Sequence, residues 1–260
     1  MLEIKNVTIS YGDRPTVKNF SMTLKKGEIA SIVGESGSGK TTVIRAVLGL
    51  LPGGGKVTEG DILFEGKSLL KNTAEEWRNL RGTDMSMIFQ DSGAMLNPIR
   101  KIGSVFVEYI RTHEKISRKA AWEKGREMLD RMRLPSSDNI MKSYPFQLSG
   151  GMRQRVGIAM AMTFQPKLLL ADEPTSALDV TTQAQIVRQM IELREEWGTS
   201  IIMVTHNLGV AAYMSDQILV MKEGQIADTG SRDQILKGGR SIYTQELLEA
   251  VPSLGGERYV

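Results

Sequence analysis

The segment from Gly34 to Thr41 has the residue types and spacing that a phosphate-binding loop requires. Its sequence, GESGSGKT, fits the P-loop pattern G-x-x-x-x-G-K-[ST]. Glycines lack a Cβ, so the backbone can take positive φ, approach phosphate oxygens closely and point its N–H groups inward. Lys40 would add a positive charge for the β- and γ-phosphates, and the Thr41 hydroxyl would ligate Mg²⁺. The predicted nucleotide-contacting residues are Gly34, Glu35, Ser36, Gly37, Ser38, Gly39, Lys40, Thr41 and Thr42.

The elements on either side of this loop agree with the pattern. Residues 28–33, EIASIV, are predicted to form a buried strand. Residues 43–48 place apolar side chains at helical spacing, so a helix would direct its N-terminal dipole at the same phosphates. Strand, loop and helix together predict an ATP or GTP site.

Polar residues follow three further predicted strands. Gln90 follows the apolar residues 85–89, Asp172 and Glu173 follow residues 167–171, and His206 follows shortly after residues 200–204. Parallel α/β sheets bind ligands at the carboxyl ends of their strands, so these side chains are expected beside the phosphate loop.

Each of these residues suits a different part of nucleotide hydrolysis. Asp172 has the position of the Walker B aspartate that holds Mg²⁺. Glu173 is suited to polarise the attacking water as a general base. A neutral His206 imidazole could hydrogen-bond the γ-phosphate. Gln90 could ligate Mg²⁺ or order the water through its amide.

The segment 148–152, LSGGM, predicts a second phosphate contact. Ser149 is a helix N-cap, and Gly150 and Gly151 follow it although each glycine costs about 1 kcal/mol of helix propensity. Bare amides and a hydroxyl at a helix N-terminus suit an anionic ligand. Because the P-loop already serves the chain's own nucleotide, this segment is expected to contact the nucleotide of a second subunit.

Composition limits the classes of protein that this chain can represent. The 260 residues are 41% hydrophobic, carry a net charge of +3 and contain no cysteine. Disulfides and thiolate metal sites are therefore excluded, and the charge is too small to imply a nucleic-acid partner. The N-terminus has no apolar signal core and no segment reaches about 18 apolar residues, so a soluble intracellular chain is expected, with a peripheral membrane role open.

The order of the elements predicts an α/β protein with a helical insertion. Residues 1–90 and 165–260 form the predicted α/β core, with an antiparallel β subdomain, and residues 91–164 form a charged helical subdomain. A helix is expected over 117–132, with a solvated basic face, and His113 is expected on the surface. The basic residues are Arg118, Lys119, Lys124, Arg126 and Arg131.

The order of P-loop, Gln90, LSGGM, LLLADE, SALD and His206 resembles the ATP-binding subunit of an ABC transporter. This resemblance implies the ABC ATPase fold, a RecA-like P-loop core with an antiparallel β subdomain and an inserted helical subdomain. It also implies that Tyr11 stacks on adenine and that Asp179 lies at a subunit contact. Two subunits would close head to tail over two ATP molecules, each with Mg²⁺.

Within that family the chain is most similar to the oligopeptide, dipeptide and nickel importers. The matching segments are GESGSGK (34–40), MIFQDSGAMLNP (87–98), YPFQLSGGMRQR (144–155), ADEPTSALDV (171–180) and YTQELLEAVPSL (243–254). The chain departs from the group at three positions. Ser92 stands where the group usually has proline, Phe146 where it commonly has histidine, and Asn207 where it usually has aspartate. Many members of the group carry a C-terminal cysteine cluster. This chain has no cysteine and so resembles the shorter nickel- or metallophore-type members.

The resemblance implies partners and a location as well. A second, homologous ATPase, two transmembrane permease subunits and, indirectly, an extracytoplasmic solute-binding protein are expected, at the cytoplasmic face of the cell membrane.

Three alternatives remain open at this stage. One is an ABC exporter cassette, which matches residues 87–98 and 243–254 poorly. The others are a chromosome-maintenance ATPase, which would need long heptad arms, and a translation factor, which usually carries two cassettes in one chain.

Overall fold

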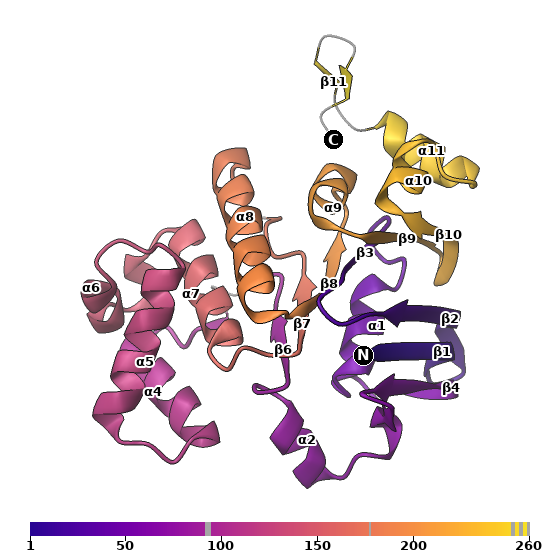
Figure 1. Cartoon of the computed structure of the whole chain (residues 1–260). Coiled ribbons are helices and arrows are strands. Elements are labelled where there is room, and N and C mark those ends of the chain that lie inside the picture. The colour runs from indigo at the N-terminus through magenta and orange to yellow at the C-terminus, as the bar shows by residue number, and fades with distance from the viewer. Residues whose placement is uncertain (92–94, 177, 251–252, 255–256, 259–260) are drawn as a thin grey trace. The chain divides into compact units, whose positions relative to one another are not determined.

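The computed structural model describes residues 1–91, 95–176, 178–250, 253–254 and 257–258 (Figure 1). These residues form two compact units. The first unit joins Met1–Trp77 to Ser200–Val260, and the second comprises Arg78–Thr199.

The first unit contains an antiparallel sheet with the strand order β2-β1-β4-β5 (Figure 1). Its strands are β1 (Leu2–Tyr11), β2 (Arg14–Leu24), β4 (Lys56–Phe64) and β5 (Lys67–Ser68). β1 buries Leu2 and Ile4, then Val7 and Ile9, because a register irregularity between Ile4 and Val7 shifts the inward-facing alternation by one residue. β2 follows β1 directly, because Arg14 already pairs with Tyr11 across a tight turn.

A second set of strands in this unit is mainly parallel, in the order β10-β9-β3-β8. These are β3 (Ile29–Val33), β8 (Ser200–Thr205), β9 (Gln217–Lys222) and β10 (Gln225–Ser231). β3 pairs in parallel with both β8 and β9, while β9 and β10 form an antiparallel hairpin. Every residue of β3 is buried, and its sequence, IASIV, is apolar except for Ser31.

The helices of the first unit are short. They are α1 (Lys40–Val47), α9 (Leu208–Met214), α10 (Arg232–Leu236) and α11 (Ile242–Glu249), with the short helix η1 (Leu69–Lys71). Two further short strands, β11 (Ser253–Leu254) and β12 (Glu257–Arg258), pair near the C-terminus. Helix α2 (Ala74–Leu80) starts from a capping box, because the Thr73 and Glu76 side chains each accept the other residue's backbone N–H.

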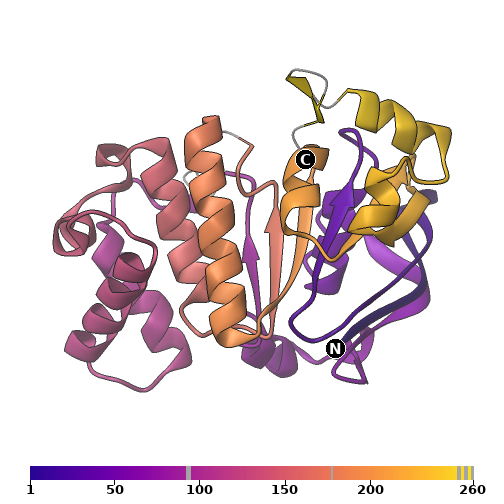
Figure 2. The same cartoon turned by 45° about the horizontal axis from the view of Figure 1, so that its top comes forward.

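The second unit holds the parallel strands β6 (Met85–Ile88) and β7 (Leu168–Asp172) and most of the long helices (Figures 1 and 2). The helices are α4 (Ile102–His113), α5 (Arg118–Arg131), α6 (Ser137–Lys142), η2 (Pro145–Gln147), α7 (Gly150–Met162) and α8 (Val180–Trp197). The helix expected over 117–132 is α5, and Ser117 caps it by accepting the N–H of Ala120.

The packing of α7 differs from the prediction. The sequence favours one packing face made by Val156, Ala159, Met160 and Thr163. Met160 is only half-buried, whereas Ile158, Ala161 and Met162 are buried with the others. α7 is therefore enclosed on most sides over its last two turns, and its periodicity is too weak to reveal a single face.

The expectation that His113 is a surface residue is wrong. Its ring is half-buried and packs edge to face against Tyr109 and Phe164, with both centroids 5.3 Å away. Burial lowers the pKa of His113, although Glu114 opposes the shift. The polar sequence around it concealed this aromatic cluster.

The predicted basic face of α5 is partly neutralised by ion pairs. Lys124 pairs with Glu114, Arg126 with Asp130 and Arg131 with Glu196. Such exposed pairs contribute little to stability, about 0–1 kcal/mol each. Across the described residues, none of the helices is both long enough and apolar enough to cross a bilayer.

Candidate active site

The P-loop connects β3 to α1. At two of its positions, Gly34 and Gly39, the structure shows why the residue must be glycine. Gly34 has φ 151°, and a Cβ at this position would lie 2.1 Å from the carbonyl oxygen of Met221 in β9. Gly39 has φ 99° and is the N-cap of α1, where a Cβ would lie 2.9 Å from a Val17 methyl group. Any larger residue at either place would displace the loop from the sheet.

Lys40 is almost fully buried and its ammonium group is turned back onto the loop. The Nζ atom donates to the carbonyl oxygens of Gly34 at 2.8 Å and Glu35 at 2.7 Å, and to the Ser38 hydroxyl at 3.4 Å. A positive charge is thus fixed at the N-terminus of α1, where the helix dipole is also positive. Both features favour an anionic ligand at this point.

His206 comes to the same end of the parallel strands as the P-loop. The register pairs Val33 with Thr205, so Gly34 and His206 each follow the last pair of neighbouring strands. His206 is exposed, and the next residue, Asn207, caps α9 by accepting the N–H of Val210 at 3.2 Å. The asparagine that departs from the family pattern therefore supports the helix that follows.

Tyr11 ends β1 and is half-buried. Its ring lies against Gly55, where a Cβ would be only 2.5 Å from Cε1. The role of Tyr11 toward adenine, implied by the resemblance, stays a prediction.

In the second unit, the structure brings Gln90 and Glu173 together. The register pairs Ile88 with Ala171, and Gln90 Nε2 donates to Glu173 Oε2 at 3.3 Å. Asp172, the last residue of β7, is only 3% exposed. The three side chains follow two adjacent strands, as the sequence predicts.

Glu173 has an unfavourable backbone conformation that the sequence does not reveal. Its φ is 44°, in the left-handed region that costs an L-residue roughly 1–2 kcal/mol. The turn is braced from both sides: the Ser176 hydroxyl donates to the Glu173 carbonyl oxygen at 3.2 Å, and buried Gln154 Nε2 donates to the Pro174 carbonyl oxygen at 2.7 Å. Gln154 belongs to α7, so the LSGG helix supports the turn that carries Glu173.

Ser149 caps α7 by accepting the N–H of Met152 at 3.3 Å, as predicted. The two glycines after it differ. Gly150 is exposed and has open space where a Cβ would lie, whereas a Cβ at Gly151 would lie 2.8 Å from a Thr182 methyl group in α8. Close packing of α7 on α8 therefore gives Gly151 a structural reason besides ligand contact.

Asp179 is exposed and caps α8. Its carboxylate accepts the Thr182 N–H at 2.9 Å and the Thr182 hydroxyl at 2.7 Å, and these bonds lower the pKa of Asp179. The side chain thus has a local role in addition to the subunit contact that the resemblance implies. Ser92 and Ala177 of the family motifs lie outside the described residues.

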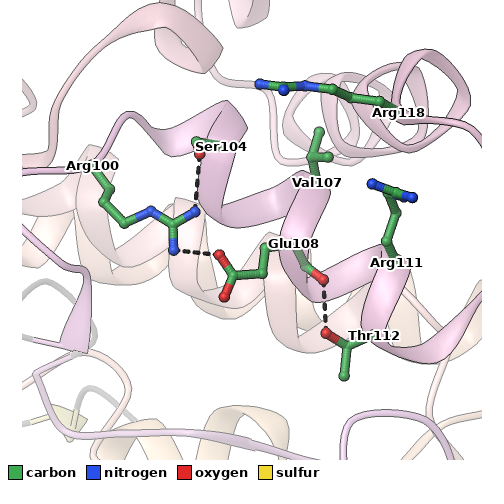
Figure 3. A pocket seen from close by; sticks show the side chains of 7 residues that line it. All are labelled: Arg100, Ser104, Val107, Glu108, Arg111, Thr112 and Arg118. Carbon is green, nitrogen blue, oxygen red and sulfur yellow. Dashed lines mark hydrogen bonds and ion pairs between the residues drawn. The ribbon is translucent and has the colours of Figure 1, made fainter.

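A separate pocket of about 400 Å³ lies on α4 and the start of α5 (Figure 3). Arg100 pairs with Glu108 and donates to the Ser104 hydroxyl at 3.0 Å, so its charge is neutralised there. The guanidinium groups of Arg111 and Arg118 also border the pocket (Figure 3). None of the predicted nucleotide-contacting residues lines it.

The comparison with known families decides the class of the protein. Residues 17–176 match the family described as "ABC transporter", which is more than half of the chain. This chain belongs to the ABC transporter family. Its ATPase identity, the use of ATP and the ABC ATPase fold follow from that membership, and the exporter and non-transport alternatives have no support among the relatives below.

The most similar relatives include importer ATPases of this family. The chain is 45% identical to the oligopeptide transport ATP-binding protein OppD of Bacillus subtilis, over 98% of this chain and 72% of that protein. It is 42% identical to the glutathione import ATP-binding protein GsiA of Escherichia coli K12, over 98% of this chain. The chain spans only 42% of the length of GsiA.

Solved structures agree with the fold of this ABC ATPase. The cassette MJ0796, in a dimeric post-hydrolysis state bound to ADP and Pi, has a TM-score of 0.79 and 30% identity, covering 89% of this chain and 99% of that one. CbiO1 of Clostridium perfringens, part of an ABC transporter complex, has a TM-score of 0.78 and 26% identity, covering 91% and 90%. The predicted membership of the peptide import group is confirmed, while the nickel or metallophore subtype stays a prediction.

The backbone of Glu173 gives a prediction about stability. Glu173→Gly should be more stable than Glu173→Ala by about 1 kcal/mol, because both remove the side chain but only glycine relieves the positive φ. The free energies of unfolding in urea measure the difference. As a control, Glu192→Gly in α8 should be less stable than Glu192→Ala by about 1 kcal/mol. Equal or greater stability of the alanine variant at position 173 would contradict the assigned backbone strain.

Proposed function

We propose that this chain binds ATP with Mg²⁺ at its P-loop and hydrolyses it to power the import of peptides. The observation that carries the proposal is the position of the Lys40 ammonium, held by two loop carbonyls at the positive end of α1. A polyphosphate placed there gains a charge-assisted bond, the loop amides and the helix dipole at one point.

The oxygen donors assigned to Mg²⁺ fit that ion. Thr41 supplies a hydroxyl, Asp172 a carboxylate and Gln90 an amide oxygen, and Mg²⁺ prefers hard oxygen ligands. When bound, Mg²⁺ would neutralise charge that develops on the phosphate oxygens. The nearly complete burial of Asp172 suits a carboxylate that acts on a cation.

Hydrolysis is assigned to the groups at the strand ends. Glu173 takes a proton from the attacking water as general base, and Gln90, 3.3 Å away, orients that carboxylate and the water. His206 would donate a hydrogen bond to the γ-phosphate from the strand beside the P-loop. The positive φ of Glu173 is consistent with a side chain held in a fixed direction for this task.

Peptides are the proposed cargo. Two of the relatives that match 98% of this chain are named for oligopeptide and for glutathione import, and glutathione is itself a small peptide. Nickel and metallophore complexes are less well supported, because neither name mentions them.

The proposed partners follow from the family resemblance of the sequence motifs. The chain would work with a second ATPase subunit of the same family and two permease subunits, at the cytoplasmic face of the membrane, and only indirectly with a solute-binding protein. The nucleotide bound by the second ATPase would be contacted by Ser149, Gly150 and Gly151 of this chain. Exposed apolar side chains at Met95 and Ile99, which precede α4, offer a surface for the membrane subunits.

Two substitutions separate hydrolysis from binding. Glu173→Gln should keep ATP affinity within about twofold and lower ATP turnover by at least about a hundredfold, because an amide cannot accept the proton of water. Lys40→Ala should weaken ATP binding itself by about tenfold or more, through loss of a charge-assisted bond. Calorimetry and steady-state phosphate release measure the two effects. Near-normal turnover by Glu173→Gln would remove the glutamate from the mechanism.

The partner assignment has its own test. Ser149→Arg should leave the ATP affinity of the isolated chain unchanged, because the serine serves the other subunit's nucleotide, but should abolish ATP-driven dimer closure and turnover in the assembled transporter. Size-exclusion chromatography with ATP and phosphate release by the complex give the readouts. Loss of ATP binding by a folded, isolated variant would contradict the head-to-tail arrangement.

A further inference from the structure

A tyrosine near the end of the chain contacts the P-loop directly. The Glu35 N–H donates to the Tyr243 hydroxyl oxygen at 3.1 Å, across 208 positions of sequence. Tyr243 lies in α11 and is only 7% exposed. It opens the segment 243–254, which the family resemblance singled out but the proposed hydrolysis does not use.

This hydrogen bond falls on the same peptide unit that holds Lys40. The peptide between Gly34 and Glu35 has the Gly34 carbonyl oxygen on one side, which accepts from Lys40 Nζ at 2.8 Å. Its N–H, donated to Tyr243, points the opposite way because a trans peptide is planar. A rotation of this peptide would break both bonds together, so Tyr243 and Lys40 fix its orientation from two sides.

Tyr243 is itself held firmly. It packs in a buried cluster with Val33 at the end of β3 and Leu208 of α9, and Lys222 Nζ lies 4.6 Å from its ring centroid. Burial is the main cause that raises the pKa of Tyr243, so the hydroxyl stays protonated near neutral pH.

Asp228 anchors the start of α11. One carboxylate oxygen accepts the Arg240 N–H at 2.6 Å, the Ser241 N–H at 3.0 Å and the Thr244 hydroxyl at 3.0 Å. Ser241 in turn caps the helix through the Thr244 N–H. The residues just before Tyr243 are thus fixed to β10, and the hydroxyl is held ready for the loop.

We propose that Tyr243 is a positioning residue for ATP, which holds the Gly34–Glu35 peptide in the orientation that presents the P-loop and Lys40 to the phosphates. The inference rests on the proposed function of the P-loop. When Lys40 turns from the loop carbonyls to a phosphate, the Gly34–Glu35 peptide loses its hydrogen bond from Lys40. The hydrogen bond from the Glu35 N–H to Tyr243 then keeps the peptide in its orientation.

Tyr243→Phe tests this role, since the ring and its packing remain and only the hydroxyl is lost. A single hydrogen bond of this kind corresponds to about a three- to tenfold change in an equilibrium constant. We expect the Kd and KM for ATP with Mg²⁺ to rise by about that factor, with kcat of the assembled transporter changed by less than about twofold. Tyr213→Phe is the matched control, because Tyr213 is an exposed tyrosine of α9 in the same unit.

A second readout reports the contact without ATP. Hydrogen exchange of the Glu35 amide should become faster by about the same factor in Tyr243→Phe and stay unchanged in Tyr213→Phe. Wild-type ATP affinity in a folded Tyr243→Phe chain would overturn the inference even if the Glu35 amide exchanged faster, because the contact would then be structural only. If instead the unaltered chain bound no ATP, or Lys40→Ala left its affinity unchanged, the proposed function of the loop would fail first.

Discussion

The P-loop depends on one close approach, that of Gly34 to the carbonyl oxygen of Met221. No side chain fits between them, since a Cβ would lie only 2.1 Å from that oxygen. The approach allows β3 and β9 to pair directly up to the loop, with Val33 opposite Val220. The Ser38 carbonyl oxygen also accepts the Gly224 N–H at 3.1 Å, so the β9–β10 hairpin supports the loop at a second point. A rigid floor of this kind allows the loop amides and Lys40 to be oriented before a ligand arrives.

In the second unit, the candidate catalytic side chains Asp172 and Glu173 are positioned by a strand end and a braced turn. Strand β7 brings Asp172 to its end in a buried position, and the next residue reverses the backbone into the left-handed region. That conformation is braced by hydrogen bonds from Ser176 and Gln154 to the carbonyl oxygens of the turn. Strain at a braced residue is a common feature of sites that need a fixed geometry. The helix that begins at LSGG therefore has a structural role within this chain in addition to its proposed role toward a second subunit.

The sequence predicted the elements around the chemistry well, because their signals are local. The P-loop glycines, the cap at Ser149 and the apolar strands all follow from residue type and spacing. Long-range contacts were missed for the opposite reason. Nothing near Tyr243 indicates that its hydroxyl meets residue 35, and the polar residues around His113 concealed its packing on Tyr109 and Phe164. Gly151 was assigned to a ligand alone, since its contact with Thr182 depends on how two helices pack.

Hydrogen exchange of the whole chain, compared with and without ATP and Mg²⁺, shows whether the P-loop holds the phosphates. If the phosphates lie on the amides of the P-loop and of the first turn of α1, exchange there should slow by at least about tenfold when ATP binds. The Glu173→Gln variant, in which hydrolysis is blocked, should give the same pattern and retain it for hours. Unchanged exchange over residues 34–42 at saturating ATP, or protection confined to the pocket on α4, would contradict the account.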